Sequence, residues 1–170
     1  MLLSISKYGE PVLEQAAAPV TSFGPEITKL VDDMFETMYS ARGVGLAAPQ
    51  VNVGKRITVI DVSAGEDANS KLVLINPEII HLEGVQVGEE GCLSIPGFRE
   101  DVKRAKLARV RAQDTTGEYF EVKGEDLLAR AMQHEIDHLN GILFIQHLSL
   151  LKRDLIKRKI KKLQKAGEWT

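Results

Sequence analysis

The pattern H-E-x-x-H at residues 134–138 constrains this chain more than any other feature does. It lies inside residues 125–139, where the spacing of apolar side chains predicts a helix. Residues four apart lie one above the other on a helix, so His134 and His138 can bind one metal ion with Glu135 beside it. The alternative is an exposed helix whose histidines pair with carboxylates. We favour the metal site, because the motif requires this helical context.

A third protein ligand is needed, because catalytic zinc sites usually supply three ligands and leave one position open. The candidates are His81, His147, a carboxylate group and Cys92. His147 lies nine residues beyond His138, on another predicted element, so it does not continue the motif with metzincin spacing. We therefore favour Cys92, the one soft anionic ligand of the chain.

Cys92 is the only cysteine, which excludes an internal disulfide. It lies in the segment EEGCLSIPG, residues 89–97, where glycine permits close backbone approach and proline ends sheet pairing. The thiol is therefore predicted at a strand end or in a loop. The alternatives are a buried cysteine that only packs and a nucleophile paired with a histidine. Metal ligation explains the cysteine and the H-E-x-x-H pattern together.

A third unusual segment, GVGLAAPQ at residues 43–50, is small and apolar and ends in one amide. By itself it is compatible with a helix end followed by a tight crossing of the backbone. Its spacing matches neither the phosphate loop G-x-x-x-x-G-K-[ST] nor the dinucleotide pattern G-x-G-x-x-G. Nucleotide binding is therefore disfavoured.

The order of the predicted elements indicates an α+β fold. A first helix is expected over residues 25–42, antiparallel strands from residue 56 to about 121, and the helix of residues 125–139 after them. The apolar residues 142–145 are predicted to form a further strand. We expect one domain over residues 1–170, with antiparallel sheets packed around the central helix that carries H-E-x-x-H.

The C-terminal segment carries the charge asymmetry of the chain. The whole chain has 22 Lys and Arg against 24 Asp and Glu, whereas residues 150–170 hold eight basic and two acidic residues. From about residue 149 to 166 we expect a basic amphipathic helix. Its apolar stripe is predicted to consist of Leu151, Leu155, Ile160 and Leu163. Such a helix can meet an anionic partner.

Membrane spans and targeting signals are not expected. The apolar runs are short pieces such as residues 57–60, far below the ~18–20 residues of a membrane helix. The N-terminus lacks the basic region and the long apolar core of a secretory signal. We expect a cytoplasmic protein that binds no membrane, with organellar and phage origins left open.

Three segments together resemble the signature motifs of the peptide deformylase family. They are GVGLAAPQ at residues 43–50, EGCLSIPG at residues 90–97 and QHEIDHLNG at residues 133–141, in the family's order and with similar separations. The resemblance extends over nearly the whole chain. It implies an enzyme that removes the N-formyl group from formyl-methionine at the start of new polypeptides, releasing formate and a free amine.

The resemblance also implies a role for each matching residue. The metal ligands would be Cys92, His134 and His138, and Glu135 would be the general acid and base. The amide of Gln50 and the backbone N–H of Leu93 would hold the oxyanion. Gly45 would pair its backbone with the peptide as an added strand, and Val44 would lie beside the methionine side chain.

The same resemblance implies one divalent metal ion, with Fe(II) expected in the cell. Zn(II), Ni(II) and Co(II) also suit one cysteine and two histidines. The basic last helix resembles the helix with which bacterial members dock on the ribosome near the exit tunnel. The alternative is a solvated basic face packed on the domain. Arg130 and Ala131 depart from the family's more apolar or cysteine-containing pattern, which puts the selectivity of the pocket in doubt.

Two other functions remain as alternatives. A zinc metallopeptidase would share H-E-x-x-H and its general base but would accept ordinary amides. A non-catalytic protein could instead close a structural zinc site with Cys92, His134, His138 and His147.

Overall fold

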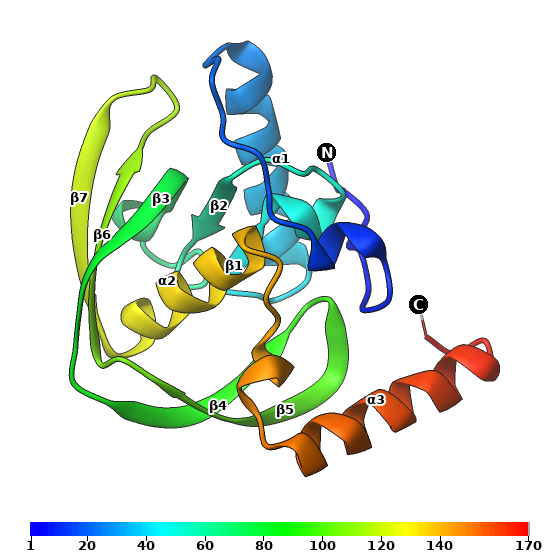
Figure 1. Cartoon of the computed structure of the whole chain (residues 1–170). Helices are drawn as coiled ribbons and strands as arrows, with labels where there is room; N and C mark the ends of the chain where they lie inside the picture. Colours follow the sequence, from blue (N-terminus) through cyan, green and yellow to red (C-terminus); the bar gives the residue numbers. More distant parts are fainter. Residues whose placement is uncertain (170) are drawn as a thin grey trace.

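The computed structural model describes residues 1–169 as an α+β fold of helices and antiparallel strands (Figure 1). The α-helices are α1 (Pro25–Ser40), α2 (Asp126–Leu139) and α3 (Leu150–Lys165). The strands are β1 (Gly45–Ala47), β2 (Ile57–Ile60), β3 (Leu72–Glu83), β4 (Gln86–Cys92), β5 (Ile95–Arg104), β6 (Leu107–Gln113) and β7 (Tyr119–Glu125). Short 3-10 helices are η1 (Pro11–Glu14), η2 (Ala48–Val51), η3 (Ala68–Ser70) and η4 (Phe144–His147).

The strands form two antiparallel sheets. The larger sheet has five strands in the order β1-β2-β3-β6-β7, so the three-residue strand β1 lies at one edge. The smaller sheet is the β4–β5 hairpin. Helix α2 lies between the five-stranded sheet and the hairpin, as Figure 1 shows. The expected central helix with sheets around it is confirmed.

Helix α1 begins where its sequence predicts and ends slightly earlier. Pro25 occupies the first turn, where its missing N–H costs no hydrogen bond. One face of the helix is buried and packs against β1 and β2 in a shared apolar cluster. The helix ends at Ser40, two residues before the predicted end at residue 42.

Two further apolar clusters hold α2 and the β4–β5 hairpin separately. Ala129, Met132 and Ile136 of α2 pack against the five-stranded sheet. A separate cluster joins Ile95 and Val102 of β5 with η4 and α3. Helix α2 therefore uses its apolar face for the larger sheet, which leaves its polar face toward the hairpin.

The strand predicted for residues 142–145 is wrong. Residues 142 and 143 are irregular, and residues 144 and 145 form the start of the 3-10 helix η4. The side chains of Leu143, Phe144 and Ile145 are buried in the cluster with α3 rather than paired with a sheet. A short apolar run is compatible with either structure, because hydrophobicity alone does not separate them.

Helix α3 has the predicted extent, and Ile160 of its predicted apolar stripe is buried, but two of the predicted leucines are not. Its buried residues are Ile156 and Ile160, whereas Leu151 and Leu155 are exposed to 71% and 46%. Ser149 caps its N-terminus by accepting a hydrogen bond from Lys152 N.

Helices among the described residues are too short or too polar to cross a membrane.

Candidate metal centre

Three potential metal ligands converge where the β4–β5 hairpin meets α2. Cys92 lies at the end of β4, and His134 and His138 lie one turn apart on α2. His138 Nε2 is 3.3 Å from Cys92 Sγ and 3.2 Å from His134 Nε2. All three ligand atoms lie within 4.8 Å of one another. The structure thus brings together the cysteine and both histidines that the sequence singles out.

This donor set fits a divalent transition metal ion. A tetrahedral ion with bonds of about 2.0–2.3 Å holds its ligand atoms about 3.3–3.6 Å apart. The thiol and the two imidazoles leave room for a fourth ligand from the adjoining cavity, which has a volume of about 640 Å³. Val44, Gly45, Leu93 and Ala131 also line this cavity.

The local backbone turns the Cys92 side chain toward the helix. The register of the hairpin shifts between Gly91 and Cys92, so that Cys92 pairs with Ile95 across a tight turn. The backbone N–H of Ser94 donates to Cys92 Sγ at 3.4 Å. The predicted position of the thiol at a strand end is confirmed.

The Gln50 side chain is fixed with its amide nitrogen toward the thiol. Its carbonyl oxygen accepts a hydrogen bond from Ala47 N at 2.9 Å. This contact directs Nε2 toward Ser94 Oγ at 3.2 Å and Cys92 Sγ at 3.5 Å. A buried amide held in this way is a preorganised donor beside the ligand cluster.

Glu135 is a buried carboxyl group on the cavity wall. Burial raises its pKa to about 7, and its Oε2 atom has no hydrogen-bond partner among the described residues. The carboxyl group lies so close to β1 that a Cβ atom at Gly45 would be 2.6 Å from Glu135 Oε1. An acid with such a pKa can both accept and return a proton near neutral pH.

Glu90 orients His134 from the hairpin side. Its Oε1 atom is 2.8 Å from His134 Nδ1, an arrangement that leaves Nε2 free for a metal ion. Although burial acts in the other direction, hydrogen bonds from Arg104 and His134 hold the pKa of Glu90 well below its usual range. Burial would also lower the pKa of His134, but hydrogen bonds to Cys92 and Glu90 raise it to about 10 in the metal-free protein.

The second histidine has different surroundings. Burial, followed by the charge of His134, lowers the pKa of His138 and so favours the neutral imidazole that a metal ion requires. His138 Nδ1 is buried and has no hydrogen-bond partner among the described residues.

The other candidate ligands lie elsewhere. His147 Nε2 is 2.8 Å from Asp137 Oδ2 and 3.3 Å from Arg104 Nη1, outside the ligand cluster. His81 is exposed on β3, 3.5 Å from Glu83. The pairing of His134 is with Glu90, a residue that the sequence did not single out although it lies two positions before Cys92.

Comparisons with known proteins agree on one family. The family model described as polypeptide deformylase matches residues 2–154. A peptide deformylase from Acidobacterium capsulatum is 61% identical over 169 residues, which are 99% of both chains. The solved structure of a peptide deformylase from Legionella pneumophila has a TM-score of 0.92 at 44% identity, covering 100% of this chain and 99% of that one. One from Thermus thermophilus has a TM-score of 0.86 at 42% identity, with coverages of 95% and 94%.

Proposed function

The chain belongs to the polypeptide deformylase family, and from this premise we propose a metal-dependent reaction on formyl-methionine that releases formate. As a member of this family it is a hydrolase that removes formyl groups from nascent peptides. The observation that carries the proposal is the convergence of Cys92, His134 and His138 beside Glu135 on the wall of one cavity.

Cys92, His134 and His138 would hold the metal ion. A divalent ion there supplies Lewis acidity toward water and toward the formyl carbonyl group. Fe(II) is the ion we expect in the cell, while Zn(II), Ni(II) and Co(II) suit the same donors. With Fe(II), air should inactivate the enzyme by oxidising the iron and Cys92, and full activity after long exposure to air would contradict this.

Glu135 would move the proton during hydrolysis. It takes a proton from the attacking water and returns it to the nitrogen of the departing amine. The Gln50 amide and the Leu93 backbone N–H would donate hydrogen bonds to the oxygen that becomes negative in the transition state. Because Gln50 is already fixed by Ala47 N, its amide needs little reorganisation during the reaction.

The peptide would bind along β1. This strand pairs with β2 through residues 45–47 and lies at the edge of its sheet, so a peptide can add to it through backbone hydrogen bonds. Gly45 would supply that backbone, and Val44 would lie beside the methionine side chain. Recognition through the main chain is compatible with the varied sequences of nascent polypeptides.

The two alternative functions have less support. A structural zinc site with four ligands would need His147, but this side chain is engaged by Asp137 and Arg104. A zinc metallopeptidase is disfavoured by Cys92, because it lies within the deformylase motif. Neither alternative accounts for the family match over residues 2–154.

Helix α3 would dock on the ribosome through its basic face. Ile156 and Ile160 are used for packing, while Lys157, Arg158 and Lys161 are exposed. Reversing the charge of these three exposed residues should weaken ribosome binding and reduce its dependence on salt. Binding that persists in this variant, or that ignores salt, would contradict docking through α3.

Formate release under anaerobic conditions tests the proposed reaction. The Fe(II)-loaded protein should release formate from a formyl-methionyl tripeptide, and Glu135→Gln and Cys92→Ala should abolish the release. Glu135→Gln should still retain its metal ion, whereas Cys92→Ala should bind the ion weakly. Absence of formate from the metal-replete wild-type protein would contradict the proposal and return attention to the peptidase and structural-zinc alternatives.

A further inference from the structure

The contact between α2 and the β4–β5 hairpin is polar, although the metal ligands come from both elements. The buried apolar clusters of residues 1–169 place α2 with the five-stranded sheet and the hairpin with η4 and α3. Cys92 lies on the hairpin, and His134 and His138 lie on α2. Polar side chains must therefore set the separation between the thiol and the imidazoles.

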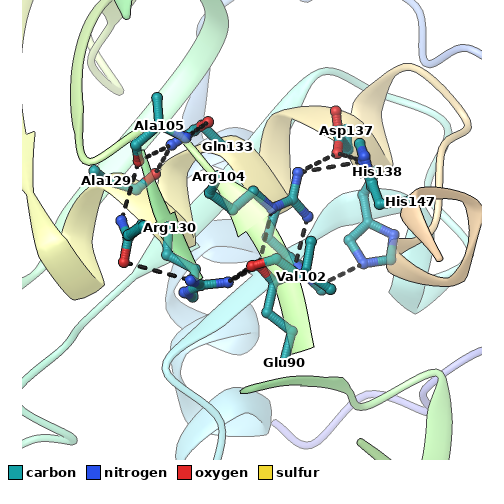
Figure 2. A network of polar contacts seen from close by, with 12 residues as sticks. Glu90, Val102, Arg104, Ala105, Ala129, Arg130, Gln133, Asp137, His138 and His147 are labelled. Atoms are coloured by element: carbon teal, nitrogen blue, oxygen red, sulfur yellow. Dashed lines mark hydrogen bonds and ion pairs between the residues drawn. The ribbon is translucent and has the colours of Figure 1, made fainter. Parts of the chain in front are cut away.

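Arg130 reaches from α2 to both strands of the hairpin (Figure 2). Its Nη1 atom donates to Glu90 Oε2 on β4 at 2.6 Å and to the carbonyl oxygen of Val102 on β5 at 3.0 Å. Its Nη2 atom lies 3.4 Å from Gln86 Oε1, also on β4. The side chain is 8% exposed. Arg130 lies one helical turn before His134, so both side chains project toward the hairpin.

Arg104 approaches the same carboxylate from the hairpin. It donates to both oxygens of Glu90, at 2.8 and 2.9 Å, and also to Asp137 Oδ2 at 2.7 Å. The described structure pairs Arg130 with one carboxylate, Glu90, whereas Arg104 has two. Two arginines and two carboxylates thus balance in charge at this buried contact.

We propose that Arg130 is a positioning residue that, through Glu90, fixes the β4–β5 hairpin against α2 and so sets the geometry of Cys92, His134 and His138. Glu90 is the link, because its second oxygen contacts His134 Nδ1 at 2.8 Å. A planar guanidinium with several donors can hold two strands at once, whereas an ammonium group cannot reproduce this fork. The inference rests on the proposed metal-dependent function.

Metal affinity is the direct test, because it does not depend on catalysis. Arg130→Met should weaken Co(II) binding, measured by competition with a chelator, about 10- to 100-fold. It should also change the visible spectrum of the Co(II)–thiolate protein. Arg130→Lys should recover only part of the affinity. Arg111→Met is the matched control, since Arg111 is exposed on β6 and contacts Tyr119, and this variant should bind Co(II) like the wild-type protein.

A double-mutant cycle tests whether Arg130 acts through Glu90. If it does, Arg130→Met combined with Glu90→Gln should bind Co(II) no more weakly than Glu90→Gln alone. Additive losses would contradict the link. Circular dichroism of the metal-free variants verifies folding. If Arg130→Met does not fold, the same measurements are made with Arg130→Lys in its place.

The kinetic constants distinguish a positioning role of Arg130 from a role in which it only lines the substrate cavity. A positioning role predicts a lower kcat for every formylated peptide at saturating Co(II), with little change in KM. Unchanged Co(II) affinity, with a KM that varies with the first side chain of the peptide, would overturn the proposal and make Arg130 a wall residue. Wild-type protein that binds Co(II) but releases no formate would contradict the proposed function instead.

Discussion

The carboxyl group of Glu135 and the backbone at Gly45 approach so closely that a side chain at Gly45 would displace the acid. A Cβ atom there would lie 2.6 Å from Glu135 Oε1 and 3.0 Å from the carboxyl carbon. We expect Gly45→Ala to lower kcat/KM by on the order of 100-fold, because a shift of about 1 Å in a reacting group has that effect. Steady-state formate release measures this change.

Gly54→Ala provides the matched control for this substitution. No heavy atom lies within 4 Å of a Cβ atom at Gly54, so its activity should equal that of the wild-type protein. Gly45→Ala should still bind one metal ion, because the three atoms nearest to the added methyl group belong to Glu135 and not to a ligand. Wild-type activity in Gly45→Ala would show that Glu135 has another working position.

Tyr39 on α1 is connected by hydrogen bonds through Asp61 to Val44, which lines the cavity. Its hydroxyl donates to Asp61, and the Asp61 N–H donates to the carbonyl oxygen of Val44 at 2.8 Å. Burial, the hydrogen bond and the charge of Asp61 raise the pKa of Tyr39 to about 12. The contribution of this pair to stability is therefore complete below the unfolded pKa of about 10 and is lost as pH rises from about 10 to 12.

Tyr39→Phe should lower the free energy of unfolding at pH 7 by about 1–2 kcal/mol. It should also remove part of the alkaline loss of stability, which urea unfolding between pH 7 and 11.5 measures. The difference between the two proteins should shrink above pH 10. A constant difference over that range would show that Tyr39 does not titrate as inferred.

Residues of the ligand cluster could be predicted, whereas their partners could not. Cys92, His134 and His138 belong to sequence motifs with a chemical meaning at fixed spacing. Glu90 and Arg104 are ordinary charged residues in a charged segment, and their pairing depends on the register of β4 and β5. The register of these two strands cannot be derived from a single sequence.

At the scale of elements, the β4–β5 hairpin lies within residues 56–121, which are predicted as antiparallel strands, but its two strands could not be delimited because their alternation runs against the usual pattern. On β4 the side chain of Glu90 is buried, while that of Val87 is 65% exposed. A period of two is normally recognised when apolar residues face inward. Here polar residues face α2, so the strand signal is inverted at the very place where the ligands are positioned.

Helix α3 packs through Ile156 and Ile160, of which Ile160 belongs to the predicted stripe, whereas the predicted Leu151 and Leu155 are exposed. Ile160 is 1% exposed, so Ile160→Ala should lower the free energy of unfolding by about 2–5 kcal/mol. Leu155→Ala removes a residue that is 46% exposed and should cost less than about 0.5 kcal/mol. Urea unfolding compares the two variants. Equal effects would contradict the packing of α3 through Ile160.

At the scale of the whole molecule, a bound metal ion would join the hairpin to α2, which otherwise meet through polar contacts. We expect metal binding to stabilise the fold by about 4 kcal/mol at a free metal concentration 1,000 times Kd. Thermal unfolding with Zn(II) and with a chelator measures this. Cys92→Ala should show a much smaller difference between the two conditions. An equal difference in that variant would place the stabilising ion elsewhere.

The overall α+β arrangement followed from element order, because the long helices and the β6–β7 hairpin have strong local signals. The structure of the segment before α3 could not be predicted in this way. Its residues Leu143, Phe144 and Ile145 are positioned by packing in a cluster that includes residues distant in the sequence. Local patterns predict elements, and packing between distant segments decides the ambiguous ones.

The brevity of β1 has a consequence for solubility. An open sheet edge that accepts peptides of many sequences is also an edge on which another copy of the chain can assemble. Three residues, 45–47, offer few backbone groups, and the chain leaves the sheet directly afterwards in η2. A short extended peptide can therefore pair with β1 during one catalytic cycle. The strand is too short, however, for copies of the protein to polymerise edge to edge through it.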